Sequence, residues 1–226
     1  MIQIYLRHCY YSDLQRKSDR SRPNWWNKQK VFENFKKTIT SKVNYTIIYD
    51  EHYGKIEDTF LRDEEKVLKV NYGNEPFSFI FTLEQAIKSH SDDTIIYFLE
   101  DDYLHIPGWV DVLYDAFTLP FDYVSLYDHP IHYIDNIQSY LIPTKLCHWR
   151  QIPYTTNTFA AKVKTLKEDF QIHYKNSIGY EYTWDEGKFL ELKDKGRILV
   201  SSIPGYSTHC HSDYITPTID WEKYIQ

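Results

Sequence analysis

Three adjacent carboxylates, Glu100, Asp101 and Asp102, are the residues of this 226-residue chain whose types and spacing are best suited to chemistry. Side by side, they raise one another's pKa unless a positive charge lies among them. A divalent metal ion is the simplest such charge, because carboxylate oxygens are ligands for Mg²⁺ and Mn²⁺. The alternative is a solvated acidic loop without a chemical role, which is what most acidic runs are.

The segments around this acidic triplet indicate where it lies. Residues 94–99 are a short apolar run rich in β-branched and aromatic side chains, which is typical of a strand buried on both faces of a parallel sheet. Pro107 and Gly108 follow the triplet and open a segment with apolar residues at helical spacing. We therefore expect the carboxylates at the carboxyl end of a central strand, where open α/β sheets bind their ligands.

The rest of the chain alternates between strand-like and helix-like segments. Strands are expected at residues 2–6, 44–49, 66–70, 121–127, 154–161 and 197–203, helices at 28–40, 76–90 and after Asp185 up to Gly196, and a loop or short hairpin at 132–153. This order predicts a single α/β domain spanning residues 1–226, with a mixed, mostly parallel sheet flanked by helices.

A hydrophobic strand that ends in Glu-Asp-Asp resembles the Asp-X-Asp-type motif of GT-A glycosyltransferases, which hold a nucleotide-sugar diphosphate through a divalent metal. The resemblance implies a Rossmann-like GT-A fold, with a nucleotide-binding half at residues 1–103 and an acceptor and catalytic half at 104–226. It makes Asp102 the metal ligand and places Asp101 and Glu100 by the ribose. Glu100 departs from the usual Asp at the first position.

The resemblance also implies the molecules that the chain binds. The cofactor would be Mn²⁺ or Mg²⁺, the donor a nucleotide sugar, with UDP the commonest nucleotide in the family, and the acceptor a carbohydrate or glycoprotein. Six more site residues follow from the order of the elements: Arg7 and Asp50 for the nucleotide, and Asp128, His129, Thr156 and Asn157 for the donor sugar and acceptor. Capping of a strand end or a turn is the structural alternative for several of them.

An acidic pair and two histidines complete the predicted site. Asp185 and Glu186 begin a helix, where capping alone explains acidic residues. In inverting GT-A enzymes such a pair supplies the general base, and Asp185 is the first choice, Glu186 the second. Either His209 or His211 would complete the metal site. A zinc site made of His209, Cys210 and His211 is the alternative, although it lacks a fourth local ligand.

Two other functions compete with glycosyl transfer. A sugar-phosphate nucleotidyltransferase usually has a Gly-rich loop with Arg and Lys after its first strand, and residues 7–22 contain no glycine. Residues 16–26 are a basic loop, which either closes over a diphosphate or is simply solvated. The third possibility is a non-catalytic domain that binds a nucleotide or sugar.

The composition of the chain excludes some classes of partner and location. A net charge of −6 argues against general nucleic-acid binding, and three scattered cysteines fit a reducing compartment. No apolar run approaches the roughly 20 residues that span a bilayer, and the chain starts directly with a strand-like segment, so neither a membrane span nor a signal peptide is expected. The small, aromatic-rich chain resembles stand-alone transferases of large viruses and bacteria, for which a cytoplasmic location (host cytoplasm if viral) is expected.

Overall fold

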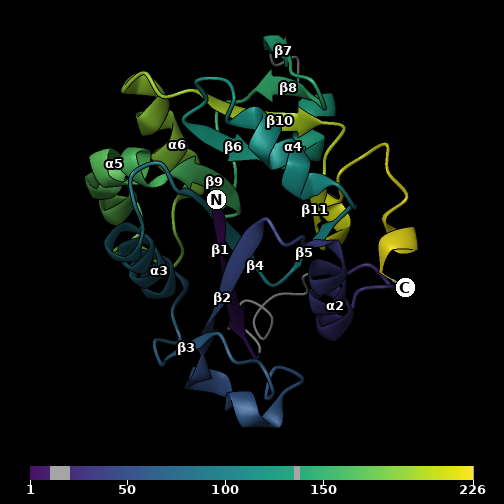
Figure 1. The fold of residues 1–226 in the computed structure, drawn as a ribbon, viewed down its shortest axis with the longest axis vertical. Coiled ribbons are helices and arrows are strands. Elements are labelled where there is room, and N and C mark those ends of the chain that lie inside the picture. Colours follow the sequence, from purple (N-terminus) through teal and green to yellow (C-terminus); the bar gives the residue numbers. More distant parts are fainter. Residues whose placement is uncertain (11–20, 135–137, 226) are drawn as a thin grey trace.

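The structure, a computed structural model, describes residues 1–10, 21–134 and 138–225. A nine-stranded sheet with the order β3-β2-β1-β4-β9-β6-β10-β8-β7 runs through its centre (Figure 1). Its strands are β1 (Ile2–Cys9), β2 (Val43–Asp50), β3 (Val67–Val70), β4 (Ile95–Glu100), β6 (Tyr123–Ser125), β7 (Leu141–Pro143), β8 (His148–Gln151), β9 (Phe159–Lys162) and β10 (Leu199–Ile203). The helices are α2 (Lys28–Thr38), α3 (Glu75–Ser89), α4 (Trp109–Ala116), α5 (Val163–Lys175) and α6 (Asp185–Asp194).

The helices cover both faces of the sheet. Helices α2 and α4 pack on one face, and α3, α5 and α6 pack on the other (Figure 1). The central strands supply side chains to both sides in alternation: Tyr97 and Leu99 of β4 join one core, and Ile96 and Phe98 join the other. This two-sided burial explains the continuous apolar run of β4. The predicted α/β fold with a mixed sheet and flanking helices is confirmed.

Parallel pairing is concentrated in the first four strands. β1 pairs in parallel with β2 and with β4, and β2 pairs in parallel with β3. The chain therefore builds β2 and β3 on one side of β1 and then returns to place β4 on the other side. The order of strands reverses between β1 and β4, and ligands of open α/β sheets bind outside such a switch point.

A second, two-stranded sheet links the C-terminal part of the chain to the acidic triplet. β5 (Tyr103–His105) starts directly after the triplet and pairs antiparallel with β11 (Ser207–His209), so that Tyr103 lies opposite His209. Trp221 in the C-terminal segment is buried and packs in a small cluster with Leu104 and Cys210. None of the described helices is long and apolar enough to cross a membrane.

Several predicted elements differ in extent from those observed. The strand expected at 154–161 is confined to β9, because the threonine hydroxyls before it bond to other segments: Thr156 to Tyr103, and Thr158 to Glu100. The strand expected at 121–127 is likewise reduced to β6, and the possible hairpin at 132–153 forms as β7 and β8. Helix α5 was not expected.

Candidate functional site

The carboxyl ends of β1, β2 and β4 bring the predicted nucleotide-binding residues to one edge of the sheet. Arg7 lies opposite Glu100, and Cys9 lies opposite Asp50, in the registers of β1 with its two neighbours. The backbone N–H of Cys9 also donates to the Asp101 carboxylate at 3.3 Å. The edge predicted from the sequence is therefore formed, and it lies at the switch point.

Each carboxylate of the triplet pairs with a different basic side chain of the protein. The nitrogen–oxygen distances are 2.9 Å from Arg7 to Glu100, 2.7 Å from Lys28 to Asp101, and 3.0 Å from Arg22 to Asp102. The sequence argument required positive charge among the three acids, and protein side chains supply it here. Arg22 belongs to the predicted basic loop, whose residues Arg16, Lys17 and Arg20 lie outside the described part of the chain.

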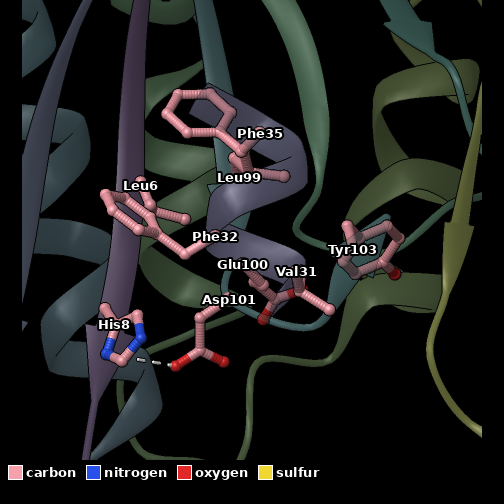
Figure 2. A pocket seen from close by; sticks show the side chains of 9 residues that line it. All are labelled: Leu6, His8, Val31, Phe32, Phe35, Leu99, Glu100, Asp101 and Tyr103. Carbon is pink, nitrogen blue, oxygen red and sulfur yellow. Dashed lines mark ion pairs between the residues drawn. The ribbon is translucent and has the colours of Figure 1, made fainter. Parts of the chain in front are cut away.

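A small cavity lies beside Asp101, between β1, β4 and α2 (Figure 2). Its volume is about 10 Å³, at the lower limit for one water molecule. His8 lines it, 3.6 Å from Asp101, and within the described structure neither of its ring nitrogens has a hydrogen-bond partner. Burial lowers the pKa of His8 to about 4, so the ring is neutral near pH 7. The cavity is too small for a nucleotide, which would have to bind along the outer edge of the sheet.

Asp102 and His209 meet through the small sheet. The Nε2 atom of His209 lies 3.0 Å from Oδ2 of Asp102, and the imidazole stacks on Tyr103 with ring centroids 5.0 Å apart. Burial raises the pKa of Asp102, but His209 and Arg22 outweigh burial and the pKa is lowered overall, so Asp102 is ionised at neutral pH. The ring centroid of His211 lies 5.9 Å from that of His209, and the Nδ1 atom of His211 accepts from the backbone N–H of Asp213. Of the two histidines, His209 is therefore the one that the structure brings to Asp102.

The zinc alternative is not supported. Cys210 is fully buried in the cluster with Leu104 and Trp221. Across residues 1–10, 21–134 and 138–225, no group of three or more His, Cys, Asp or Glu side chains is placed to hold a metal ion. A metal at Asp102 and His209 would therefore need further ligands from a substrate or water, which is how Mg²⁺ is commonly held in phosphate-binding sites.

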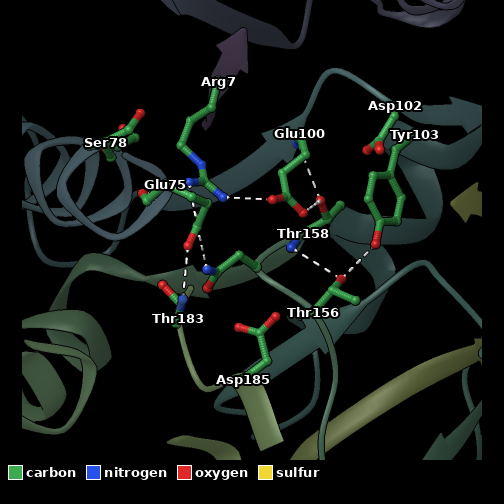
Figure 3. Close-up of polar contacts among 12 residues, drawn as sticks. Arg7, Glu75, Ser78, Glu100, Asp102, Tyr103, Thr156, Thr158, Thr183 and Asp185 are labelled. Atoms are coloured by element: carbon green, nitrogen blue, oxygen red, sulfur yellow. Dashed lines mark hydrogen bonds and ion pairs between the residues drawn. The ribbon is translucent and has the colours of Figure 1, made fainter. Parts of the chain in front are cut away.

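Arg7 and Glu100 form part of a buried polar network (Figure 3). Arg7 donates to Glu100 and, at 2.7 Å, to Glu75 at the start of α3. The hydroxyl of Thr158 lies 3.3 Å from Glu100. Burial raises the pKa of Glu100 to about 8 although Arg7 opposes the shift. Both terminal nitrogens of Arg7 thus contact carboxylates, and its role in phosphate binding remains a prediction.

Asp50 has the contacts of a residue that shapes a turn. It accepts three backbone hydrogen bonds, from His52 (3.1 Å), Tyr72 (3.1 Å) and Gly73 (2.9 Å). Gly73 has φ of 60°, and a Cβ atom there would come within 2.4 Å of the His52 ring. These contacts agree with the structural alternative for Asp50, and its role in nucleotide binding stays a prediction.

The two acids of the predicted general-base pair have different surroundings. Asp185 is the first residue of α6, and its Oδ1 accepts from Lys188 at 2.8 Å. Its side chain is 32% exposed, and Figure 3 shows it below the Arg7–Glu75–Glu100 network. Burial and Glu75 raise the pKa of Asp185, although Lys188 opposes them. Glu186 is exposed. Of the two acids, Asp185 therefore has the more defined position, and the choice of Asp185 over Glu186 as general base stays a prediction.

The four residues predicted for the sugar and acceptor divide into two groups. Thr156 accepts from the Tyr103 hydroxyl at 2.8 Å, and Asn157 donates to Glu75 at 2.9 Å, so both lie within the network at the sheet edge. Asp128 is fully buried, and the Tyr133 hydroxyl donates to it at 2.5 Å. His129 accepts from a backbone N–H at 3.0 Å. A substrate role for these four residues is untested.

Sequence reasoning missed three residues of this site: Lys28, Glu75 and Lys188. Lys28 and Glu75 begin helices, where they read as ordinary first-turn residues. Lys188 follows Asp185 by three positions, a spacing that places two side chains on the same helix face and was a usable signal.

Comparisons with known proteins give a fold but no family. No family model matches the chain, and no curated protein matches it in sequence. Among solved structures, the chain is similar to the crystal structure of 2-C-methyl-D-erythritol 4-phosphate cytidylyltransferase from Francisella tularensis, with a TM-score of 0.51, 14% sequence identity, and coverage of 98% of this chain and 97% of that chain. That protein is a nucleotidyltransferase. At this identity the likeness establishes a shared Rossmann-like α/β fold.

Proposed function

We propose that this chain is a metal-dependent transferase whose nucleotide substrate lies along the carboxyl ends of β1, β2 and β4. The observation that carries the proposal is the contact of Asp102 with His209 beside the switch point, 3.0 Å apart although the two residues are 107 positions apart in sequence. The likeness to a nucleotidyltransferase fold supports the nucleotide-binding part of this proposal.

Asp102 and His209 are the residues that would hold the metal. The donor set is one ionised carboxylate and one imidazole, which suits Mn²⁺ and accepts Mg²⁺ when phosphate oxygens complete the coordination. A bound ion would neutralise negative charge on the phosphate oxygens of the leaving group, which is the nucleoside diphosphate in glycosyl transfer and pyrophosphate in nucleotidyl transfer. Arg22, on the same carboxylate oxygen as His209, supplies a second positive charge for the phosphates.

The surroundings of Asp185 favour glycosyl transfer from a nucleotide sugar over nucleotidyl transfer. UDP is the first nucleotide to test. Its Oδ1 is held by Lys188, and none of the described residues donates to Oδ2. A raised pKa makes this carboxylate a better base for the proton of an attacking sugar hydroxyl than an ordinary aspartate. In this reaction Asp185 would accept the acceptor proton.

Nucleotidyl transfer to a sugar phosphate is the second candidate, and the fold comparison favours it. In that reaction a phosphate oxygen of the acceptor attacks the α-phosphorus of a nucleoside triphosphate, and pyrophosphate leaves. A triphosphate needs more positive charge than a diphosphate, whereas Arg7 and Lys28 are paired with carboxylates and Arg22, paired with Asp102, is the one described cation assigned to the phosphates. The charge balance is therefore less suited to this candidate.

Calorimetric titration with UDP, GDP and CMP, each with Mn²⁺ and with a chelator, tests the shared part of the proposal. We expect one nucleotide to bind in a metal-dependent manner. Asp102→Asn should weaken that binding at least tenfold, since it removes the charged metal ligand. Asp92→Asn is the matched control, because Asp92 forms an exposed ion pair with Lys167 before β4 begins. Equal affinity of the Asp102→Asn and Asp92→Asn variants would refute the metal assignment.

The products separate the two reactions. Release of UDP from UDP-sugars with Mn²⁺ identifies glycosyl transfer or its hydrolytic side reaction, whereas release of pyrophosphate from CTP or UTP with a sugar phosphate identifies nucleotidyl transfer. Metal-dependent nucleotide binding without either product would leave a non-catalytic binding domain. Failure of all the nucleotides to bind would refute the proposed function.

A further inference from the structure

Lys188 is a buried cation in the core between the sheet and helices α3, α5 and α6. It is 0% exposed, and its ammonium group lies 4.9 Å from the ring centroid of Phe79, 5.4 Å from that of Phe159 and 4.8 Å from that of Phe189. A buried ammonium group costs several kcal/mol unless charges and hydrogen bonds compensate it. An apolar residue would fill this space at a lower cost in free energy, so the polar contacts of the lysine have to explain why it is there.

The polar contacts of Lys188 supply that reason. Its Nζ donates to Oδ1 of Asp185 at 2.8 Å and also to the side-chain oxygen of Asn157. The two acceptors come from different segments, one at the start of α6 and the other in the loop before β9. Lys188 therefore fixes Asp185 relative to the loop that also carries Thr156.

The contacts continue from Asn157 to the nucleotide edge. Asn157 donates to Oε1 of Glu75 at 2.9 Å, and Arg7 donates to the same oxygen at 2.7 Å. The other oxygen of Glu75 accepts from the backbone N–H of Thr183 at 3.0 Å, two residues before Asp185 (Figure 3). Asp185 is thus tied to the end of β1 through side chains and through its own backbone.

We propose that Lys188 is a positioning residue, which holds the Asp185 carboxylate in place and in its charged form while leaving Oδ2 for the substrate. The proposal rests on the proposed function, in which Asp185 is the general base. It adds a residue whose side chain contacts no substrate and acts through Asp185.

The charges around Asp185 give the size of the effect. Glu75 faces it with negative charge, and Arg7 and Lys188 with positive charge, whereas Glu100, whose pKa burial raises to about 8, is largely protonated at pH 7. His173, near Lys188, has a pKa of about 3 because of burial and is neutral. Removing Lys188 leaves only Arg7 to oppose the burial of Asp185 and the charge of Glu75, so the pKa of Asp185 should rise by about one unit or more.

Lys188→Met tests this directly. Methionine has nearly the length of lysine and suits a space between phenylalanine rings, so the variant should fold. Lys195→Met is the matched control, because Lys195 follows the same helix and pairs with a different buried acid, Asp169. Carboxyl ¹³C NMR of aspartate-labelled protein, with the Asp185 signal assigned from Asp185→Asn, reports the pKa without any assay of activity. Lys188→Gln, which is also uncharged, replaces Lys188→Met if that variant fails to fold.

We expect the Asp185 titration to move to higher pH by about one unit or more in Lys188→Met and to stay in place in Lys195→Met. The acid limb of the UDP-release profile should move with it, roughly a tenfold loss on that limb per unit, with nucleotide affinity unchanged. An unshifted Asp185 titration would overturn the inference even if Asp185→Asn is inactive. Full activity of Asp185→Asn would instead refute Asp185 as the base and leave the NMR result to decide whether Lys188 orders this carboxylate.

Discussion

Glu75 joins segments that are far apart in the sequence. Replacing it should lower the free energy of unfolding by more than is usual for a partly exposed glutamate. Its two carboxylate oxygens accept from Arg7 of β1, from Asn157 before β9 and from the backbone of Thr183 before α6. Glu75→Gln keeps the size of the side chain but removes the charge and turns an amide N–H₂ toward one of these donors. Arg7, which is 7% exposed, keeps only Glu100 as an acidic partner, and burial raises the pKa of Glu100 to about 8.

The expected loss can be estimated from these contacts. Breaking a buried ion pair by changing one partner costs about 3–5 kcal/mol, and because the Glu75 side chain is 26% exposed we expect about 3 kcal/mol. Glu84→Gln is the matched control, with the same substitution on the same helix. Glu84 pairs with Lys88 at 3.2 Å on an exposed surface, and such a pair contributes about 0.3 kcal/mol.

Urea unfolding of the three proteins at pH 7, followed by circular dichroism, measures the difference. The result supports the reasoning if Glu75→Gln lowers the free energy of unfolding by several times the loss in Glu84→Gln. A Glu75→Gln variant within about 0.5 kcal/mol of the control would refute it. The pair would then be no more than a surface contact, and the connection between the predicted halves at residues 1–103 and 104–226 would have to lie elsewhere.

Two other predictions test the acid chemistry and the metal site. Burial opposes ionisation of Asp169, but Arg197 outweighs burial and lowers the pKa of this carboxyl group in the folded protein. The ion pair therefore stabilises the fold at pH values above the unfolded-state pKa near 4. The stability difference between the parent and Asp169→Asn should vanish as the pH falls through the folded-state pKa of Asp169. A difference that persists unchanged in acid unfolding curves down to about pH 2 would contradict this. His209→Ala should weaken Mn²⁺-dependent nucleotide binding by about tenfold or more and His211→Ala by much less, because in the described part of the chain His209 is the histidine that lies 3.0 Å from Asp102. Calorimetry that ranks the two variants in the opposite order would make His211 the ligand.

The sequence was sufficient to predict β4 and the start of α4 because the information is local there. The run from Thr94 to Leu99 has the composition of a strand buried on both faces, and the acids that follow it can only lie at the carboxyl end of that strand. Pro107 and Gly108 marked the start of α4, where Gly108 has φ of 91°, a conformation that a side chain would strain. These features depend on neighbouring residues alone.

The second half of the sheet could not be read in the same way. Residues 154–158 have the threonines of a strand, but the partners of their hydroxyls, Tyr103 and Glu100, are more than 50 positions away. The antiparallel insertion of β9 between β4 and β6 is likewise set by long-range packing. Helix α5, in contrast, had a local signal in Val163, Leu166 and Phe170, whose spacing is helical.

Burial of charged side chains was the least predictable part of the site. Lys188 stands in a polar helix segment and reads as a surface residue, yet three phenylalanines from separate elements enclose it. No local pattern encodes such an enclosure. What the sequence does contain is the pair Asp185 and Lys188 at a spacing of three, and two charged residues of opposite sign in one helical turn deserve inspection whenever one of them is a candidate base.

The charge balance of the acidic triplet limits how a metal ion can act. Three adjacent carboxyl groups suggest a metal, but Arg7, Lys28 and Arg22 already pair with them one by one, and Glu100 has a pKa raised to about 8. The triplet is therefore stable without an ion, and its sequence alone is weaker support for a metal than it first suggests. The stronger support is geometric: Asp102 lies 3.0 Å from a ring nitrogen of His209, within hydrogen-bond distance, whereas Asp101 lies 3.6 Å from that of the buried His8. Because Arg22 shares the Oδ2 atom of Asp102 with His209, a metal must compete with a guanidinium for this oxygen. A nucleotide changes that competition, since its phosphates offer Arg22 another partner and the metal further ligands. Metal and nucleotide should for this reason bind together more tightly than either binds alone.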